Sequence, residues 1–270
     1  MSVSLAYPLG GTKTELDRLL AQAKSYEPQA NWLLDQIGIR SGARVLDVGC
    51  GPIGILNLLS ERVGPQGSVV GIEREARFVE MAQAEIARRK LLNVEILEGD
   101  VLATGLPKES FDLVHERLVM INVSARGAFL AEMLSLLRPT GTIALEDVDN
   151  VSWLCEPPHP SWDILFSAFR TVFQASGGDG FIGRRLPTLL REAGVENIKV
   201  KVNVEAPVKG DYRRSHLISL IDSVRDKVVA KGLLSEAELN HHRDTLVRHL
   251  DDPHTIVVDK LLVQSWGRRV

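Results

Sequence analysis

The sequence predicts an α/β fold built on a mostly parallel sheet, and three observations lead to this prediction. From residue 43 onward, short aliphatic runs alternate with longer stretches of helical spacing, as in right-handed β–α–β units. A glycine-rich turn, Gly49-Cys50-Gly51-Pro52-Ile53-Gly54, joins the first of these runs to a helical stretch. The 270 residues, 44% of them hydrophobic, can bury one large core without requiring a second domain.

The first forty residues are predicted to form an N-terminal helical cap (1–40). Apolar residues recur at helical spacing over residues 12–36, and Thr12 with Glu15 fits a capping box. Tyr26-Glu27-Pro28 breaks the pattern, and a second helix is expected over about 29–37, ending near Gly38.

The main domain is predicted to occupy residues 41–270, with its alternating elements first and a looser second half. Helical insertions are expected at about 151–180, where aromatic residues gather, and at about 211–250, where Ser235 and Glu238 fit a second capping box. No internal repeat or low-complexity linker separates these parts, so a single compact unit is expected. Strands are expected at 44–48, 68–73, 93–97, 111–116, 141–146, 197–206 and 255–264, and helices at 53–63, 74–89, 125–137, 185–193, 211–231 and 235–249.

Charge and composition exclude several classes of protein. The net charge of −3 argues against a nucleic-acid or anionic-membrane binder, which would need a concentrated basic face. Cys50 and Cys155 are too few for a disulfide scaffold or a metal site, so we expect no metal and a reducing, cytoplasmic setting. The first residues lack the pattern of a signal peptide, and no apolar run is long enough for a membrane span. The sequence does not indicate an oligomeric state.

The glycine-rich turn predicts a site for a nucleotide-like ligand, and three acidic residues narrow the choice. Glycines allow a tight turn and a close approach of the backbone to a ligand, but dinucleotide-binding and nucleoside-binding enzymes share this spacing. Asp47 lies two residues before the first glycine, where it would repel a pyrophosphate and attract an ammonium group. Glu73 ends the second strand about 20 residues further on, where a carboxylate can accept both ribose hydroxyls. Asp100 follows the third strand and can receive an adenine amino group.

These segments resemble the class I S-adenosylmethionine-dependent methyltransferases of the small-molecule type. The resemblance covers residues 40–147 well and implies a Rossmann-like, seven-stranded, mostly parallel sheet with helices on both faces and an antiparallel last strand. The segments 197–206 and 255–264 could supply strands six and seven. The segments that carry the resemblance are Val45–Gly54, Ile72-Glu73, Glu98-Gly99-Asp100-Val101, Phe111-Asp112-Leu113-Val114 and Leu137-Arg138-Pro139-Thr140-Gly141-Thr142.

The resemblance also implies S-adenosylmethionine as the cofactor and S-adenosylhomocysteine as the product. Arg117 could meet the cofactor carboxylate or form a salt bridge with a local acid, and Tyr7 and Tyr26 of the cap could close over the cofactor. The expected cofactor-binding residues are Tyr7, Asp47, Gly49, Gly51, Glu73, Arg74, Asp100, Val101, Glu116 and Arg117.

Methyl transfer from a sulfonium is an in-line displacement that needs mainly alignment and the exclusion of water. His115 is the sharpest candidate for a general base, although a hydrogen-bonded core histidine fits the same apolar strand. Glu146 and Asp147 could hold or deprotonate an amine or hydroxyl acceptor, or could be solvated loop acids. Trp153 and Phe173, with Tyr26, could line an acceptor pocket, although helix packing explains aromatic residues at this spacing equally well.

The sequence therefore favours transfer of a methyl group to an N or O atom of a small molecule, as in secondary metabolism. The fourth strand does not end in Asn/Asp-Pro-Pro-Tyr, which similar enzymes use on nucleic-acid bases. One alternative is a C-methyltransferase acting on a quinone-like or isoprenoid acceptor. A second is an NAD(P)-dependent oxidoreductase, against which Asp47 and the lack of a Tyr-x-x-x-Lys pair argue. A third is a non-catalytic S-adenosylmethionine-binding protein, against which the intact turn, Glu73 and Asp100 argue.

Overall fold

A seven-stranded sheet forms the centre of the protein, in a computed structural model that describes residues 13–270, with side chains from residue 17. The strand order is β3-β2-β1-β4-β5-β9-β7, and β9 runs antiparallel to both of its neighbours. This arrangement confirms the predicted Rossmann-like, mostly parallel sheet with an antiparallel last strand. The strands are β1 (Arg44–Val48), β2 (Ser68–Glu73), β3 (Val94–Glu98), β4 (Phe111–Arg117), β5 (Leu137–Asp149), β7 (Glu196–Asn203) and β9 (Leu261–Arg268).

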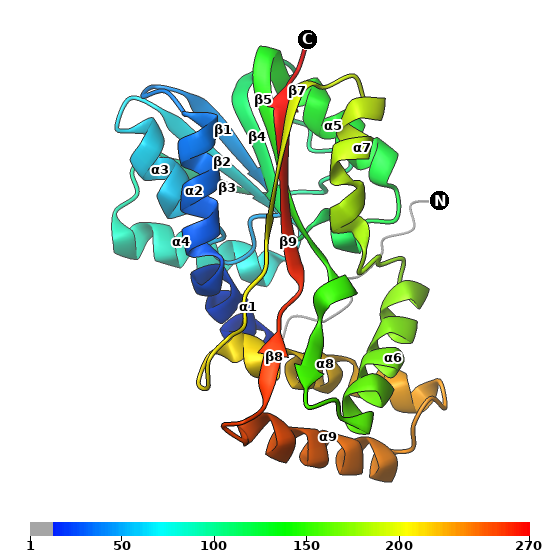
Figure 1. Cartoon of the computed structure of the whole chain (residues 1–270). Helices are drawn as coiled ribbons and strands as arrows, with labels where there is room; N and C mark the ends of the chain where they lie inside the picture. Colours follow the sequence, from blue (N-terminus) through cyan, green and yellow to red (C-terminus); the bar gives the residue numbers. More distant parts are fainter. Residues whose placement is uncertain (1–12) are drawn as a thin grey trace.

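Helices cover both faces of the sheet because its central strands are apolar on both sides. Val45 packs into one core with the helices of one face, whereas its neighbour Leu46 packs into the core of the other. The first core contains α2, α3 and α4, and the second contains α5 and α7, on opposite sides of the sheet in Figure 1. The helices are α1 (Lys13–Ser25), α2 (Glu27–Ile37), α3 (Leu56–Val63), α4 (Ala76–Arg89), α5 (Arg126–Leu136) and α7 (Leu186–Glu192).

A third core lies beyond the carboxyl edge of the sheet, in the lower part of Figure 1. It joins α6 (Pro160–Ala175), α8 (His216–Ala230) and α9 (Glu236–Asp251), which come from the two predicted insertions. The capping box of Ser235 and Glu238 at the start of α9 is confirmed. The predicted capping residues Thr12 and Glu15 lie outside the residues whose side chains the structure describes. Between residues 13 and 270, the larger elements are connected by the 3-10 helices η1 (Met120–Asn122), η2 (Asn150–Ser152), η3 (Ile182–Arg185) and η4 (Tyr212–Ser215).

The structure corrects three of the predicted boundaries. The last predicted strand, 255–264, is two strands: β8 (Ile256–Val258) pairs with β6 (Leu154–Glu156), and β9 then enters the main sheet. Strand β5 is longer than expected, because antiparallel pairing with β9 continues through Asp149. Helix α3 begins at Leu56 rather than residue 53, because the left-handed glycines of the turn, Gly51 and Gly54, cannot continue a helix.

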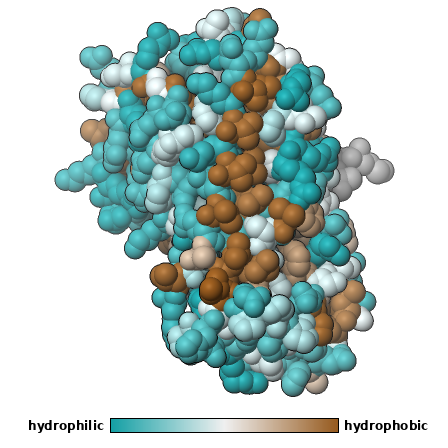
Figure 2. Space-filling view, in the orientation of Figure 1, coloured by the Kyte–Doolittle hydropathy of each residue, from teal (hydrophilic) through white to brown (hydrophobic). Residues whose placement is uncertain are grey.

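The edge strand β7 leaves an apolar strip on the surface. Val200 and Val202 of β7 are about half exposed, at 48% and 51%, and Figure 2 shows an apolar band over the region of β7 and β9. None of the described helices is long and apolar enough to cross a membrane.

Candidate active site

A cavity of about 440 Å³ opens at the carboxyl ends of the parallel strands, where open α/β sheets bind their ligands. At one end it is lined by the glycine-rich turn and the residues that follow β2 and β3, and at the other by aromatic and charged side chains of α1, α6 and α8. Its volume lies within the range of about 300–1,000 Å³ that is usual for small-molecule sites. The cavity thus has room for a nucleoside-like cofactor and an acceptor side by side.

The glycine-rich turn has a backbone conformation that residues with a side chain rarely adopt. Gly49 has a φ of +68°, and a Cβ at this position would lie 2.5 Å from a methyl group of Val119. A Cβ at Gly54 would lie 2.5 Å from the carbonyl oxygen of Cys50. At Gly51 a Cβ would meet nothing within 4 Å, so this glycine serves the left-handed φ of +58° alone. The turn therefore presents bare backbone to the cavity.

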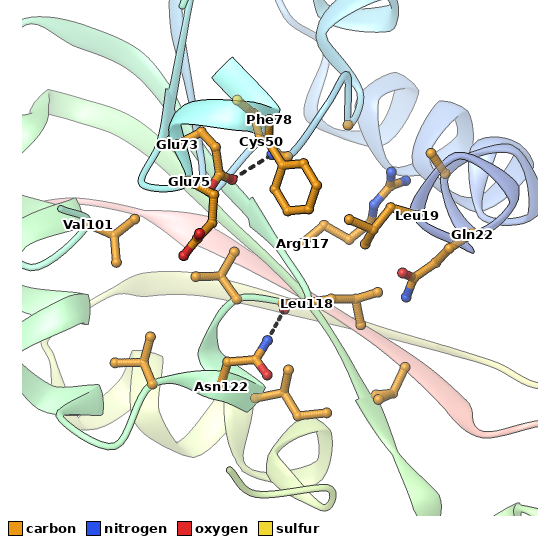
Figure 3. A pocket seen from close by; sticks show the side chains of 18 of the residues that line it. Leu19, Gln22, Cys50, Glu73, Glu75, Phe78, Val101, Arg117, Leu118 and Asn122 are labelled. Carbon is orange, nitrogen blue, oxygen red and sulfur yellow. Dashed lines mark hydrogen bonds between the residues drawn. The ribbon is translucent and has the colours of Figure 1, made fainter. Parts of the chain in front are cut away.

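Glu73 fixes this turn to the end of β2. One carboxylate oxygen accepts the N–H of Gly51 at 3.0 Å, and the other accepts the N–H groups of Arg74 and Glu75 at 2.8 and 2.9 Å. Burial raises the pKa of Glu73, and these N–H donors oppose the rise. Glu73 and Arg117 end β2 and β4, Val101 follows β3, and the three side chains face one space in Figure 3. The carboxylate lies where the sequence places the ribose contacts.

The structure brings the other expected cofactor-binding residues of this end to the same cavity. Asp47, Arg74, Asp100 and Val101 all line it. The Asp100 carboxylate accepts the N–H of Leu102 at 2.9 Å, which holds the segment after β3 in a turn. The predicted contact Tyr7 lies outside the described residues.

His115 borders the cavity, and both of its ring nitrogens are held by buried carboxylates. Its Nδ1 lies 2.7 Å from Asp47 and its Nε2 lies 2.8 Å from Glu146, and the His115 side chain is fully buried. Burial alone would lower the pKa of His115, but the two carboxylates outweigh it and raise the pKa to about 9. The imidazole therefore carries a proton on both nitrogens at neutral pH. These contacts favour the core-histidine alternative, and the role of His115 as general base stays a prediction.

Glu146 and Asp147, the other two predicted catalytic residues, are also hydrogen-bonded to groups inside the core. Glu146 is fully buried and accepts from His115 and from Gln264, at 2.8 and 2.6 Å. Asp147, equally buried, accepts the N–H groups of Ile121 and Val148. Neither lines the cavity, so the structure gives no support to their predicted catalytic roles.

Glu116 was expected to bind the cofactor, but it is not among the residues that line the cavity. Its side chain is fully buried, and one oxygen accepts the N–H groups of Val119 and Met120 at 3.0 and 3.3 Å. Burial raises the pKa of Glu116 to about 7. Glu116 and Asp147 thus hold the backbone of residues 119–121, which covers the glycine turn through Val119.

Four polar groups at the cavity have no partner among the described residues. They are Nη1 of Arg117, the hydroxyl of Tyr26, Nε1 of Trp153 and Oδ1 of Asn150, each on a residue that lines the cavity. A buried donor or acceptor without a partner is destabilising unless a ligand or water satisfies it. Arg117, Tyr26, Trp153 and Phe173 all line the cavity, and their expected contacts with the cofactor carboxylate and the acceptor stay predictions.

The sequence interpretation missed a cationic cluster at the acceptor end. Lys260 Nζ lies 2.6 Å from Nδ1 of His216, and Arg18 Nη1 lies 3.3 Å from Nε2 of the same ring. All three side chains are buried and line the cavity. They come from α1, α8 and the turn before β9, far apart in the sequence. Short spacing could not reveal them, although buried charged residues in otherwise apolar segments are a weak signal for such a site.

The residues present fit S-adenosylmethionine. The cavity offers the Glu73 carboxylate beside an open glycine turn, the Asp100 segment next to it, and an unpaired Arg117 donor for a carboxylate. The Asp100 segment, Glu73 and Arg117 lie at the ends of β3, β2 and β4, and this spatial order matches the adenine, the ribose and the amino-acid end of the cofactor.

Comparisons with known proteins agree with this assignment. Residues 39–194 match the family described as a methyltransferase domain. A nocamycin O-methyltransferase of Saccharothrix syringae is 39% identical over 120 residues, which are 44% of this chain and 43% of that protein. A demethylmenaquinone methyltransferase of Listeria monocytogenes is 30% identical over 140 residues, which are 52% of this chain and 56% of that protein.

Among solved structures, phosphoethanolamine N-methyltransferase 2 of Haemonchus contortus, in complex with phosphomonomethylethanolamine and S-adenosylhomocysteine, has a similar fold. It is 16% identical with a TM-score of 0.55, over 89% of this chain and 52% of that chain. The chain spans about half the length of the curated relatives that it matches. Because the family match covers more than half of its residues, this chain belongs to the methyltransferase domain family and has the fold of the class I S-adenosylmethionine-dependent enzymes.

Proposed function

We propose that this protein transfers a methyl group from S-adenosylmethionine to an oxygen or nitrogen atom of a small molecule. The observation that carries the proposal is the single cavity that joins the glycine turn and Glu73 to an aromatic, cationic acceptor end. We place the reaction in secondary metabolism and in the cytoplasm, on the grounds of composition and of the O-methyltransferase relative.

The chain itself has three tasks in this reaction. Glu73 and the glycine turn hold the nucleoside part, and Arg117 holds the carboxylate of the amino-acid part. The aromatic side chains of Tyr26, Trp153 and Phe173 position the acceptor and exclude water. The cofactor, when bound, supplies an activated methyl group, so alignment alone can contribute about 7–11 kcal/mol to catalysis.

Methylation of a carbon atom on a quinone-like acceptor is the second candidate. The demethylmenaquinone methyltransferase relative favours it, as does the aromatic lining of the acceptor end. Carbon-13 NMR of the product made with a labelled methyl donor separates the two, since O-, N- and C-methyl groups differ in chemical shift.

Calorimetry with S-adenosylhomocysteine and, separately, with NADH tests the cofactor assignment. We expect one molecule of S-adenosylhomocysteine to bind per chain and NADH to give no heat of binding. Binding of NADH alone would instead support the oxidoreductase alternative, and binding of neither would support a site that has lost its function.

A further inference from the structure

Lys260 lies at the acceptor end of the cavity and is almost fully buried, at 6% exposure. Its Nζ is 2.6 Å from Nδ1 of His216 and 4.2 Å from the centre of the Trp153 ring. Neither contact involves a carboxylate, which is the usual partner of a buried lysine. The amine thus lies at the acceptor end without a carboxylate in direct contact among the described residues, although the charge of the neighbouring Asp259 acts on it.

The hydrogen-bond pattern around His216 determines the state of this amine. A neutral imidazole has one nitrogen that donates and one that accepts, and a guanidinium can only donate. Because Arg18 Nη1 lies against Nε2 at 3.3 Å, Nε2 is the accepting nitrogen and Nδ1 carries the proton. Nδ1 then donates to Lys260 Nζ, which can accept only as an uncharged amine with a free lone pair.

The surroundings also disfavour charge on both groups. Burial lowers the pKa of Lys260 to about 8; Asp259 opposes this shift, while Arg18 and Arg213 add to it. Burial, followed by the charges of Lys260 and Arg18, holds the pKa of His216 well below its usual value.

The other titratable and aromatic groups around Lys260 and His216 do not favour a charge on either of them. The ring of Tyr212 lies 5.2 Å from His216, and burial raises the pKa of the Tyr212 phenol. Burial also raises the pKa of Tyr26 at the same end of the cavity, so both phenols are uncharged. The Trp153 ring can receive an N–H of an uncharged amine as well as of an ammonium.

Resting on the proposed function, we propose that Lys260 is the general base of the reaction, oriented by His216 and Arg18, and that the acceptor is an acidic hydroxyl of a phenol or enol. An amine with a pKa near neutrality can accept a proton from a phenol or an enol, whereas an alkyl alcohol is too weakly acidic to give its proton to such an amine. Arg18 and Arg117 line the same cavity and favour a developing oxyanion over a protonated amine acceptor.

The step balances without a further reactant. Lys260 Nζ gives up the hydrogen bond from Nδ1 of His216 as the acceptor binds. Its freed lone pair then takes the proton of the acceptor O–H, and the oxygen forms the new bond to the methyl carbon. The carbon–sulfur bond breaks with its electron pair on sulfur, which gives the methyl ether, S-adenosylhomocysteine and a Lys260 ammonium. The ammonium then returns its proton to water.

NMR of protein labelled with carbon-13 at the lysine Cε atoms tests the state of the amine, with the Lys260 signal assigned from Lys260→Arg. We expect this signal to titrate with a midpoint near 8, and Arg18→Met to raise the midpoint. A Lys260 midpoint at or above about 10, the ordinary value for a lysine, would overturn the proposal. This readout does not require turnover, so its failure is distinct from a failure to bind S-adenosylhomocysteine, which would instead refute the proposed function.

Turnover of two phenols by the protein with S-adenosylmethionine tests the role of the amine. With 4-methylphenol, Lys260→Met should lower kcat about 10²- to 10⁴-fold while the Kd of S-adenosylhomocysteine stays within about twofold. With 4-nitrophenol, which ionises readily in mildly alkaline buffer, the same variant should lose far less activity.

Lys201→Met is the matched control, because Lys201 lies over the Trp32 ring at 4.4 Å but does not line the cavity. It should leave both rates unchanged. Equal losses with the two phenols, an unchanged kcat in Lys260→Met, or no methylation of either phenol by protein that binds S-adenosylhomocysteine would each overturn the assignment.

Discussion

Replacement of His115 should change how the stability of the protein depends on pH. The imidazole lies between Asp47 and Glu146, and all three side chains are at most 3% exposed. Its pKa is raised to about 9 in the folded protein, compared with about 6.5 in an unfolded chain. Because the folded value is the higher one, the stabilisation is complete below about pH 6.5 and is lost as the pH rises through about 9.

The size of the effect follows from this difference. A shift of about 2.5 pKa units corresponds to about 3 kcal/mol, of which about 2 kcal/mol should disappear between about pH 7.5 and pH 9.5. In His115→Leu this loss should be absent. The variant should also be less stable by about 3–5 kcal/mol near pH 7.5, because Asp47 and Glu146 are left as buried carboxylates without a cation. Urea unfolding at several pH values measures both quantities.

Comparison with the wild type removes the contributions of groups that do not contact His115. Asp47→Asn and Glu146→Gln in the His115→Leu background remove those of its two partners. Lys260 titrates in the same window with the opposite sign, because its pKa is lowered, but it is present in both proteins. His254→Leu serves as the control, since His254 is exposed, and should retain the wild-type dependence. If His115→Leu shows the same loss of stability with rising pH as the wild type, His115 is not charged in the folded protein and the reasoning is refuted.

Three further predictions concern the cofactor end. Glu73→Ala should weaken S-adenosylhomocysteine binding about 30- to 100-fold by calorimetry, whereas Glu98→Ala, at the exposed end of the neighbouring strand, should not; equal losses would contradict the ribose contact. Arg117→Met should weaken S-adenosylhomocysteine at least about tenfold but leave methylthioadenosine, which lacks the carboxylate, within about twofold, and equal losses would show that Arg117 does not hold the carboxylate. Gly54→Ala should destabilise the protein by about 2 kcal/mol more than Gly38→Ala in urea unfolding. Both glycines have a positive φ, but only a Cβ at Gly54 would contact backbone atoms. Similar losses of stability in the two variants would contradict the steric argument.

The sequence was sufficient to predict the cofactor half of the site because that half is local. β1, the glycine turn and the acid at the end of β2 lie within thirty residues, and their order in the chain is also their order in space. Hydrophobic runs determine the strands, and the right-handed crossover rule places their carboxyl ends at one edge. Glu73, Asp100 and Arg117 could therefore be assigned to one cavity without coordinates.

The buried acids were misjudged for a physical reason. Glu116, Glu146 and Asp147 continue their strands past the point where most strands would meet solvent, and a sequence does not show what will cover them. In the structure, the backbone of residues 119–121 and the antiparallel strand β9 supply the donors that make these carboxylates tolerable inside the core. Tertiary packing brings the backbone of residues 119–121 and strand β9 next to these carboxylates, and local sequence spacing does not encode such packing.

The acceptor half is assembled from segments that meet only in the folded chain. Substitutions in these segments can therefore alter the acceptor half without altering the cofactor half. Arg18, Trp153, His216 and Lys260 belong to the cap, the two helical insertions and the turn before β9. Gln264 joins these parts to the sheet, since its side chain donates both to Glu146 and to the carbonyl of Gln29 in α2. The Asp47–His115–Glu146 chain thus connects the cofactor edge to the helix that follows Tyr26. We therefore expect substitutions in the insertions to change the acceptor while leaving cofactor affinity intact, and substitutions in the buried chain to affect both together.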